Sequence, residues 1–178
     1  MIKYNYPTIT VIIIILLCVN NNYSAPADFP WGAGIHIVSQ GIGRDSEYSK
    51  FRLSDMDGYK NIIVSYMTDV DKNIKNDIVV LRTKSGTVTD YIFVKDRLYT
   101  VSRDWNIVDT EKEAWIRRAI SDKYGTASVK EDGGFWIYSY STGNTKVLYY
   151  RVRTSPNTYR CRVYYYTKNL FKMLLMQN

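Results

Sequence analysis

The sequence has few residues that bind metals or act as nucleophiles. It contains one histidine and two cysteines, whereas a zinc site usually needs several His or Cys ligands. Cys18 lies in an apolar run near the amino terminus, which leaves Cys161 as the cysteine in the body of the chain. One cysteine cannot close an internal disulfide, so the fold depends on its core. We expect Cys161 to be buried, with pairing between chains as the alternative.

Motifs for catalysis and cofactor binding are also lacking. No G-x-S-x-G motif accompanies His36, so a serine triad is not indicated. The Gly-Ile-Gly at 41–43 belongs to no complete glycine fingerprint, which disfavours a phosphate loop. Residues 69–73 begin like a calcium loop, but Ile74 and Val80 replace its essential glycine and glutamate. We therefore expect a polar hairpin loop at 69–73, and the sequence predicts no cofactor and no metal site.

A run long enough to cross a membrane is missing as well. The apolar stretch 8–19 would form a helix of about 18 Å, shorter than the roughly 30 Å of a bilayer core. Lys3 precedes this stretch and Ala-Pro-Ala at 25–27 follows it. Residues 1–27 are therefore typical of a signal peptide, with an uncleaved anchor or lipidation of Cys18 as alternatives. We expect an exported protein, periplasmic or secreted, without a transmembrane segment after cleavage.

The charge balance favours acidic partners. The chain carries 24 Lys and Arg against 17 Asp and Glu, a net charge of +7. Such a balance suits an anionic lipid or polysaccharide, a nucleic acid or an acidic protein. Export makes nucleic acid the least fitting of these, so we expect an acidic protein or an anionic envelope polymer as partner.

The first half of the chain contains several stretches typical of strands. They are rich in β-branched and aromatic residues and are found at 61–67, 77–84, 87–95 and 97–102. Short turns at 85–86 and 95–96 separate the last three. Hairpin-length turns between such stretches predict an antiparallel meander.

The stretch 110–124 has the period of a helix. Thr110 and Glu113 match a capping box, and Gly125 matches a helix stop. The expected apolar face consists of Trp115, Ile116, Ala119, Ile120 and Tyr124. We expect Glu111, Glu113 and Asp122 on the polar side of this helix.

Strand patterns return after the helix, at 135–141, 146–153 and 158–166, and a short closing helix is expected at 167–176. The order of strands, helix and strands with short connections predicts an α+β fold. Its antiparallel sheet would carry one main helix on one face. The length of residues 28–178 suits a single domain.

The last hairpin carries the strongest binding pattern. Because strand side chains alternate between faces, we expect seven residues on one exposed face: Tyr149, Arg151, Arg153, Arg160, Arg162, Tyr164 and Tyr166. Guanidinium groups can fork onto phosphate or carboxylate, and tyrosine rings offer stacking surfaces. The alternative is a solvated outer face that these side chains merely cover. Cys161 would lie on the opposite, core-like face.

Several short motifs follow one another along the chain, each occurring once. They are Phe29-Pro30-Trp31-Gly32, Tyr91-Ile92-Phe93 followed by Arg97-Leu98-Tyr99-Thr100-Val101, Lys123-Tyr124-Gly125, Trp136, Val147-Leu148-Tyr149 and Val163-Tyr164-Tyr165. This pattern resembles small exported bacterial proteins of uncharacterised families. The resemblance covers roughly residues 29–170. It implies a bacterial envelope setting and an α+β fold, and it carries over no catalytic residue.

The sequence favours a non-catalytic interaction module of the envelope that docks an anionic or acidic partner through the Arg/Tyr face. One alternative is a cell-wall or glycan-active hydrolase, although no pair of carboxylates stands out. Another is a small-ligand binder with an apolar cavity between helix and sheet, near Trp115 and Trp136.

Overall fold

The computed structural model describes residues 29–43, 47–83, 87–170 and 172. The elements in chain order are α2 (Ile35–Gly43), β1 (Tyr48–Arg52), η1 (Leu53–Asp55), α3 (Ile62–Val70), η2 (Lys72–Asp77), β2 (Ile78–Thr83), β3 (Val88–Val94), β4 (Arg97–Asp109), α4 (Thr110–Tyr124), β5 (Ser128–Asp132), β6 (Phe135–Thr142), β7 (Thr145–Ser155) and β8 (Thr158–Thr167). The expected signal peptide and much of the expected closing helix lie outside the described residues. Within them, no helix is long and apolar enough to cross a membrane.

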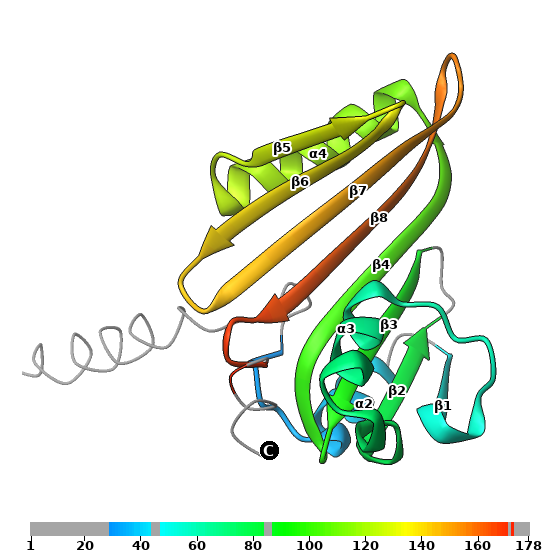
Figure 1. Cartoon of the computed structure of the whole chain (residues 1–178), viewed down its shortest axis with the longest axis vertical. Coiled ribbons are helices and arrows are strands. Elements are labelled where there is room, and N and C mark those ends of the chain that lie inside the picture. The colour runs from blue at the N-terminus through cyan, green and yellow to red at the C-terminus, as the bar shows by residue number, and fades with distance from the viewer. Residues whose placement is uncertain (1–28, 44–46, 84–86, 171, 173–178) are drawn as a thin grey trace, which may run out of the picture.

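The strands form one eight-stranded sheet in the order β1-β2-β3-β4-β8-β7-β6-β5. All neighbouring strands pair antiparallel. The long strand β4 pairs with β3 through its first part and with β8 through most of its length. Figure 1 shows β4 running beside both groups of strands, so it joins an N-terminal half (β1–β3) to a C-terminal half (β5–β8).

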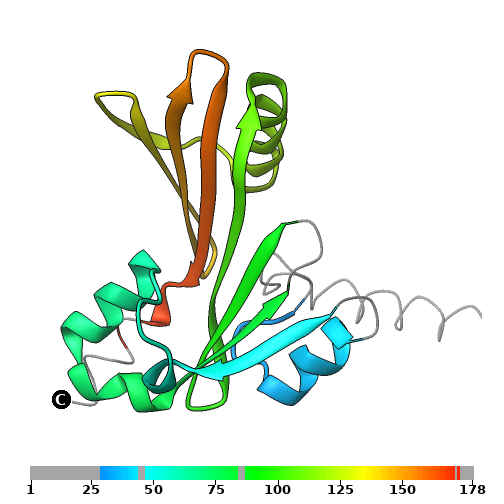
Figure 2. The same cartoon turned by 90° about the vertical axis from the view of Figure 1, so that its right-hand side faces the viewer.

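Two hydrophobic cores form on opposite faces of the sheet. The first packs α4 and α2 against one face and includes Ile116, Ile120 and Val38. The second packs α3 and η2 against the other face and includes Ile63 and Met67. Figure 2 shows α3 and α2 on either side of the lower half, whereas α4 alone flanks the upper half. One face of the C-terminal half therefore has no helix over it among the described residues.

The α+β prediction and its antiparallel sheet are confirmed. The meander at 77–102 corresponds to β2, β3 and β4, and the three late strands correspond to β6, β7 and β8. Lys95 and Asp96 have φ angles of 48° and 63°, the left-handed pair that a two-residue hairpin turn requires. The helix at 110–124 is also confirmed, although Asp109 caps it in place of Thr110 and accepts a hydrogen bond from the backbone N–H of Lys112.

The strand predicted at 61–67 is wrong, because this segment begins helix α3. The Asn61 side chain accepts hydrogen bonds from the backbone N–H groups of Ile63 and Val64, which starts a helix and precludes an extended conformation. Ile63, Val64 and Met67 are buried on one side of that helix. The polar loop expected at 69–73 is likewise the end of α3 and the start of η2.

Asn61 ties α3 to the sheet, which makes it a sensitive position for stability. It is 5% exposed, and its amide donates to Ser102 Oγ of β4 at 3.1 Å. We expect Asn61→Ala to lower the free energy of unfolding by about 1–3 kcal/mol, because the cap and a buried hydrogen bond are both lost. Urea denaturation monitored by circular dichroism measures this change.

Asn73 provides the matched control, since its side chain is exposed and makes no hydrogen bond to the described residues. We expect Asn73→Ala to change the free energy of unfolding by less than about 0.5 kcal/mol. Equal losses for Asn61→Ala and Asn73→Ala would contradict the capping role.

Candidate functional site

The pairing of β7 with β8 decides where the predicted binding residues lie. Directly paired residues of neighbouring strands share a face of the sheet. Tyr149 pairs with Val163, Arg151 with Cys161, and Arg153 with Tyr159. These pairs point toward α4, where Tyr149, Cys161 and Val163 belong to the first core.

The prediction that seven Arg and Tyr side chains share one face is therefore wrong. Tyr149, Arg151 and Arg153 lie on the side of α4, whereas the other four lie on the opposite side: Arg160, Arg162, Tyr164 and Tyr166. The cause is a register shift between Arg153 and Ser155, next to the turn. Because strand side chains alternate, a shift by one residue moves every later side chain of one strand to the other face.

On the side of α4, a charged cluster lies buried beneath the helix. Glu113 is 2% exposed, so its expected place on the polar side of the helix is wrong. Its carboxylate lies 3.4 Å from Arg151 Nη1 and 3.3 Å from Arg117 Nε. The Tyr149 hydroxyl donates to it at 3.2 Å. The Arg151 guanidinium lies 4.0 Å from the centre of the Trp136 ring.

This cluster also surrounds Cys161, which is buried as predicted. Its sulfur lies 3.1 Å from the Tyr149 hydroxyl. Burial raises the pKa of the Cys161 thiol to about 11, and burial is also the main cause that raises the pKa of Tyr149. The thiol is therefore protonated at neutral pH, which does not suit a nucleophile. The cluster is a structural link between α4 and the sheet.

The opposite side of the C-terminal half forms what we call the open face. Its residues point away from α4 according to the strand pairing: Ile107, Phe135, Ile137, Leu148, Tyr150, Val152, Arg160, Arg162, Tyr164 and Tyr166. The ring of Tyr150 contacts Phe135 and Tyr164 at centroid distances of 5.7 Å and 5.4 Å. Burial raises the pKa of Tyr150 to about 12, and neighbouring tyrosines that include Tyr66 of α3 add to this effect. The open face is thus an aromatic surface bordered by α3.

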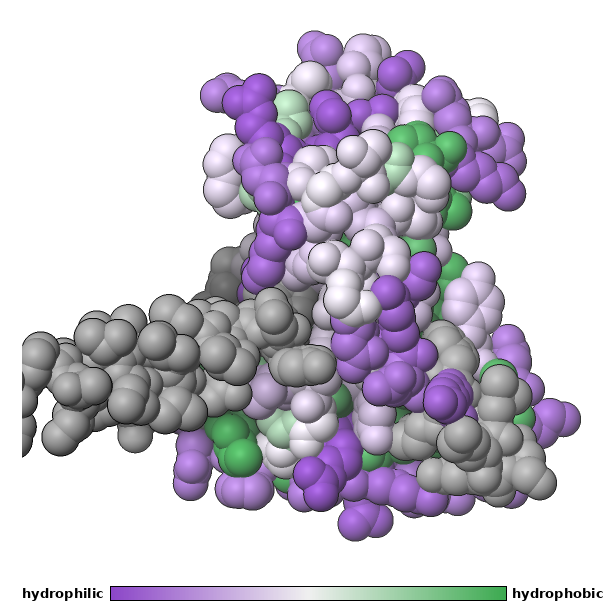
Figure 3. Space-filling model, turned by 90° about the vertical axis from the view of Figure 1, so that its left-hand side faces the viewer, coloured by the Kyte–Doolittle hydropathy of each residue, from purple (hydrophilic) through white to green (hydrophobic). Residues whose placement is uncertain are grey.

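Figure 3 shows the molecule from the side of the β5–β7 strands, where it narrows between an upper and a lower part. Weakly polar and apolar residues gather around this waist, and hydrophilic residues dominate the top and the base. Ile107 and Val152, both on the open face, are 58% and 37% exposed, and Tyr66 is 48% exposed. The open face therefore combines half-buried rings with exposed apolar side chains.

Positive charges surround the apolar part of the open face. The strand pairing places Lys130, Lys146, Arg160 and Arg162 on this face together with the carboxylates of Asp104 and Asp132. Arg162 donates to Asp104 and to the Tyr164 hydroxyl. Burial lowers the pKa of Arg162, but these hydrogen bonds raise it above its ordinary value. Asp104 neutralises Arg162 and Asp132 offsets part of the charge of Lys130, Lys146 and Arg160, so the face keeps a positive excess.

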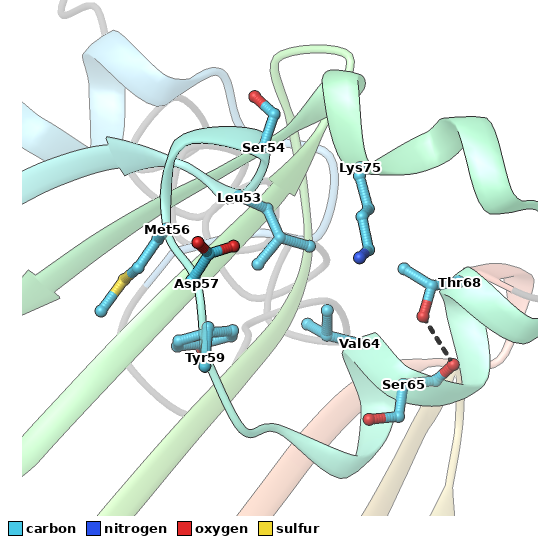
Figure 4. A pocket seen from close by; sticks show the side chains of 10 residues that line it. Leu53, Ser54, Met56, Asp57, Tyr59, Val64, Ser65, Thr68 and Lys75 are labelled. Carbon is cyan, nitrogen blue, oxygen red and sulfur yellow. Dashed lines mark hydrogen bonds between the residues drawn. The ribbon is translucent and has the colours of Figure 1, made fainter.

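A cavity of about 240 Å³ lies between η1, the loop that follows it and α3. Figure 4 shows Leu53, Val64 and the Lys75 amine pointing into this space, whereas Met56 points away. Its polar lining is mostly engaged in local hydrogen bonds. Thr68 donates to the Ser65 carbonyl, and the nearby Tyr59 hydroxyl donates to Asp90. The Lys75 amine and the Asp57 carboxylate remain as exposed charges, which do not form a catalytic set.

No group of three His, Cys, Asp or Glu residues suited to a metal ion occurs among the described residues. Asp71 of the calcium-like stretch caps η2 through a hydrogen bond from the backbone N–H of Asn73. The buried carboxylates Asp90 and Glu113 are each ion-paired with arginine. Both of these buried carboxylates are therefore engaged in ion pairs that link elements of the fold.

A groove of about 180 Å³ runs between α4 and the strands β4 and β8. It contains Trp115, near which an apolar cavity was expected, but Trp136 lies elsewhere, against Arg151. Tyr165 lies on the core-like face of β8, as alternation predicted, whereas the contribution of Trp105 was not predicted, because it lies at the irregularity between Asp104 and Asn106. The groove is distinct from the open face, since the two lie on opposite sides of the sheet.

The Glu113 cluster predicts a large stability effect. Glu113→Ala would leave Arg151 buried without its carboxylate, and we expect a loss of about 3–5 kcal/mol in the free energy of unfolding. Urea denaturation measures the loss. Glu111→Ala, at an exposed position in the first turn of the same helix, should cost less than about 1 kcal/mol. Equal effects for the two substitutions would contradict a buried ionic link.

The raised pKa of Cys161 predicts slow alkylation of the folded protein. With a folded pKa of about 11 against roughly 8.5 when unfolded, the folded thiol is neutral at pH 8. We expect alkylation by iodoacetamide at pH 8 to be at least about 100-fold slower in the folded than in the urea-unfolded chain. Mass spectrometry of the peptide containing Cys161 separates its signal from that of Cys18. Similar rates in both states would contradict the burial of this thiol.

Comparisons with protein-family models, with curated proteins and with solved structures find no match for this chain. The resemblance to small exported bacterial proteins stays a prediction, and the candidate sites stand on their geometry alone.

Proposed function

We propose that this chain is an exported, non-catalytic interaction module that docks an acidic protein through its open face. The main support for the proposal is that, in the described part of the chain, a helix covers only one of the two sides of the C-terminal half of the sheet. Helix α4 packs on one side of the C-terminal half, whereas the other side joins the second core at Tyr164 and carries the half-buried rings of Tyr150 and Phe135 and exposed apolar side chains beyond it. Soluble proteins rarely leave a large apolar surface exposed without a binding role.

The chemistry of the open face favours a protein partner. Covering apolar surface contributes about 25 cal/mol per Å², and the rings of Tyr150 and Phe135 present such surface at the centre. Tyrosine and arginine are enriched in protein interfaces, where a ring or a guanidinium offers both apolar contact and hydrogen bonds. An anionic polysaccharide would match the lysines but would leave the apolar centre uncovered.

The charge on the rim favours an acidic partner. Lys130, Lys146 and Arg160 surround the apolar centre, and the chain as a whole has a net charge of +7. Complementary charges at a rim raise the association rate and suppress wrong partners, although they add little affinity. The partner would therefore present carboxylates around an apolar contact area.

Photo-crosslinking tests this function. A benzophenone amino acid would replace Val152 on the open face or Tyr66 of α3 at its border, and Arg118 on the outer side of α4 in the control. Each protein would be exposed to extract of the cells that produce it. We expect capture of one acidic protein at positions 66 and 152 and none at position 118.

Charge reversal provides a second readout of the same proposal. We expect Lys146→Glu with Arg160→Glu to reduce capture at least about tenfold, because like charges would then meet at the rim. Lys112→Glu with Arg118→Glu changes the net charge equally but lies on α4, so capture should persist. Equal capture at position 118, equal loss in both double variants, or capture of a polysaccharide would overturn the proposal.

A further inference from the structure

The cavity of about 240 Å³ in the N-terminal half is a further candidate binding site. Its lining comes from η1 and the loop after it, from α3 and from η2, and none of these residues belongs to the open face. A cavity of about 150 Å³ can hold a benzene ring, so this space suits a ligand of roughly nine or ten non-hydrogen atoms. An inference about this cavity is therefore independent of the proposed docking function.

Two opposite charges line the cavity. Figure 4 shows the Lys75 amine reaching into the space from η2 and Asp57 on the loop, with Leu53 between them in this view. Neither charged side chain forms an ion pair or a hydrogen bond with the described residues. Both side chains are exposed, so a ligand in the cavity can reach them.

The hydroxyl groups on α3 leave the recognition of charge to these two side chains. Ser65 donates its hydroxyl proton to the Asn61 carbonyl, and Thr68 donates to the Ser65 carbonyl. Because these protons are already engaged, neither hydroxyl can donate to an anion in the cavity. The Lys75 amine is therefore the donor for an anionic group of a ligand, and the Asp57 carboxylate is the acceptor for a cationic group.

The floor of the cavity is apolar. Leu53 and Val64 are 6% and 4% exposed and belong to the second core, and both point into the space in Figure 4. The Tyr59 hydroxyl donates to Asp90, so this residue offers the cavity its ring. An aliphatic group on a ligand would cover this apolar floor, whereas the hydroxyl groups of a sugar would not.

We propose that this cavity binds a zwitterionic α-amino acid with an aliphatic side chain of about the size of leucine. Its carboxylate would contact the Lys75 amine, its ammonium group would contact Asp57, and its side chain would cover Leu53 and Val64. Hydrogen bonds between charged groups are the strong ones, and a zwitterion supplies both kinds at once. A simple anion or a simple amine would satisfy only one of the two charges.

Isothermal titration calorimetry of the full-length chain with leucine tests the proposal. We expect saturable binding with a dissociation constant of about 0.1–1 mM, a range typical of a ligand with about nine non-hydrogen atoms. Isocaproate lacks only the ammonium group of leucine and isoamylamine lacks only the carboxylate, and each should bind at least about fivefold more weakly. Glycine lacks the side chain and should bind at least about tenfold more weakly.

Two variants test the assigned contacts. We expect Lys75→Met to weaken leucine binding at least about fivefold while leaving isoamylamine binding unchanged, because isoamylamine has no carboxylate. Asp57→Asn should weaken the binding of leucine and isoamylamine but leave isocaproate binding unchanged. Lys72→Met and Asp69→Asn are the matched controls at exposed positions outside the cavity, and both should bind leucine like the unmodified chain.

The remaining outcomes also decide the matter. No saturation by leucine below about 20 mM, or equal binding of leucine and either analogue, would overturn the proposal. Equal losses in the control variants would reduce the effect to net charge and would also overturn it. Saturable binding of glucose without binding of leucine would assign the cavity to a sugar instead. Because none of these variants alters the open face, failure here leaves the docking proposal unaffected.

Discussion

The buried carboxylate of Glu113 is the interaction on which the C-terminal half of the molecule depends. Removing a carboxylate from water costs several kcal/mol unless cations and hydrogen bonds replace the solvent. Arg117 supplies one cation from the same helix, and Arg151 supplies another from β7. Arg151 reaches the carboxylate because the register shift near the hairpin turn directs it toward α4. In an unshifted hairpin Arg151 would point to the other face. The buried carboxylate therefore requires this strand register, because only this register brings Arg151 to Glu113.

A second polar network has the same role in the N-terminal half, on the opposite face. Arg82 of β2 donates to both oxygens of Asp90 on β3, at 2.7 Å and 2.9 Å. The Tyr59 hydroxyl donates to the same carboxylate, and burial, assisted by Asp90, raises the pKa of Tyr59. Asn61 links this network to the start of α3. Each half thus fixes one helix to one face through a carboxylate–arginine pair.

The placement of these two helices explains why one face stays open. Helix α4 covers one side of β6–β8, and α3 covers the other side of β2 and β3. The N-terminal half gains a second cover from α2, which packs Val38 and Ile42 on the same face as α4. The C-terminal half has no counterpart among the described residues. The tyrosines of the open face reduce this exposure, because the rings of Tyr150 and Tyr164 pack together and against the second core.

The sequence predicted the elements whose pattern is local. Alternation and turn residues identified β2, β3, β4 and the three late strands, and the 3.6-residue period identified α4. Helix α3 was missed because a short apolar run fits a strand and a buried helix equally well. Asn61 was the available signal, since it precedes the run as an N-cap. The elements α2, β1 and β5 were not predicted, because they are short and their sequence patterns are weak.

The candidate sites were harder to predict because they depend on contacts between distant segments. The assignment of Arg151 to an exposed face followed correctly from alternation, but a single bulge reversed it. Glu113 fits a capping box in sequence, yet the Asp109 cap leaves it free to turn inward toward Arg151. Neither effect has a signature within one strand or one helix. Register and ion pairing across elements are set by the packed core rather than by the local pattern.

The open face and the groove use alternate residues of the same strands. On β4, Asp104 faces the open face while Arg103 lines the groove. On β8, Tyr164 contacts the aromatic rings of the open face while Tyr165 lines the groove. Both strands have hydrogen-bonded neighbours on either side, so they cannot shift without breaking the sheet. Energetic coupling between two sites requires an element that can adopt two conformations. The hydrogen-bonded neighbours of β4 and β8 hold these strands in one conformation. The two surfaces are therefore chemically separate, and substitutions on one leave the side chains of the other in place.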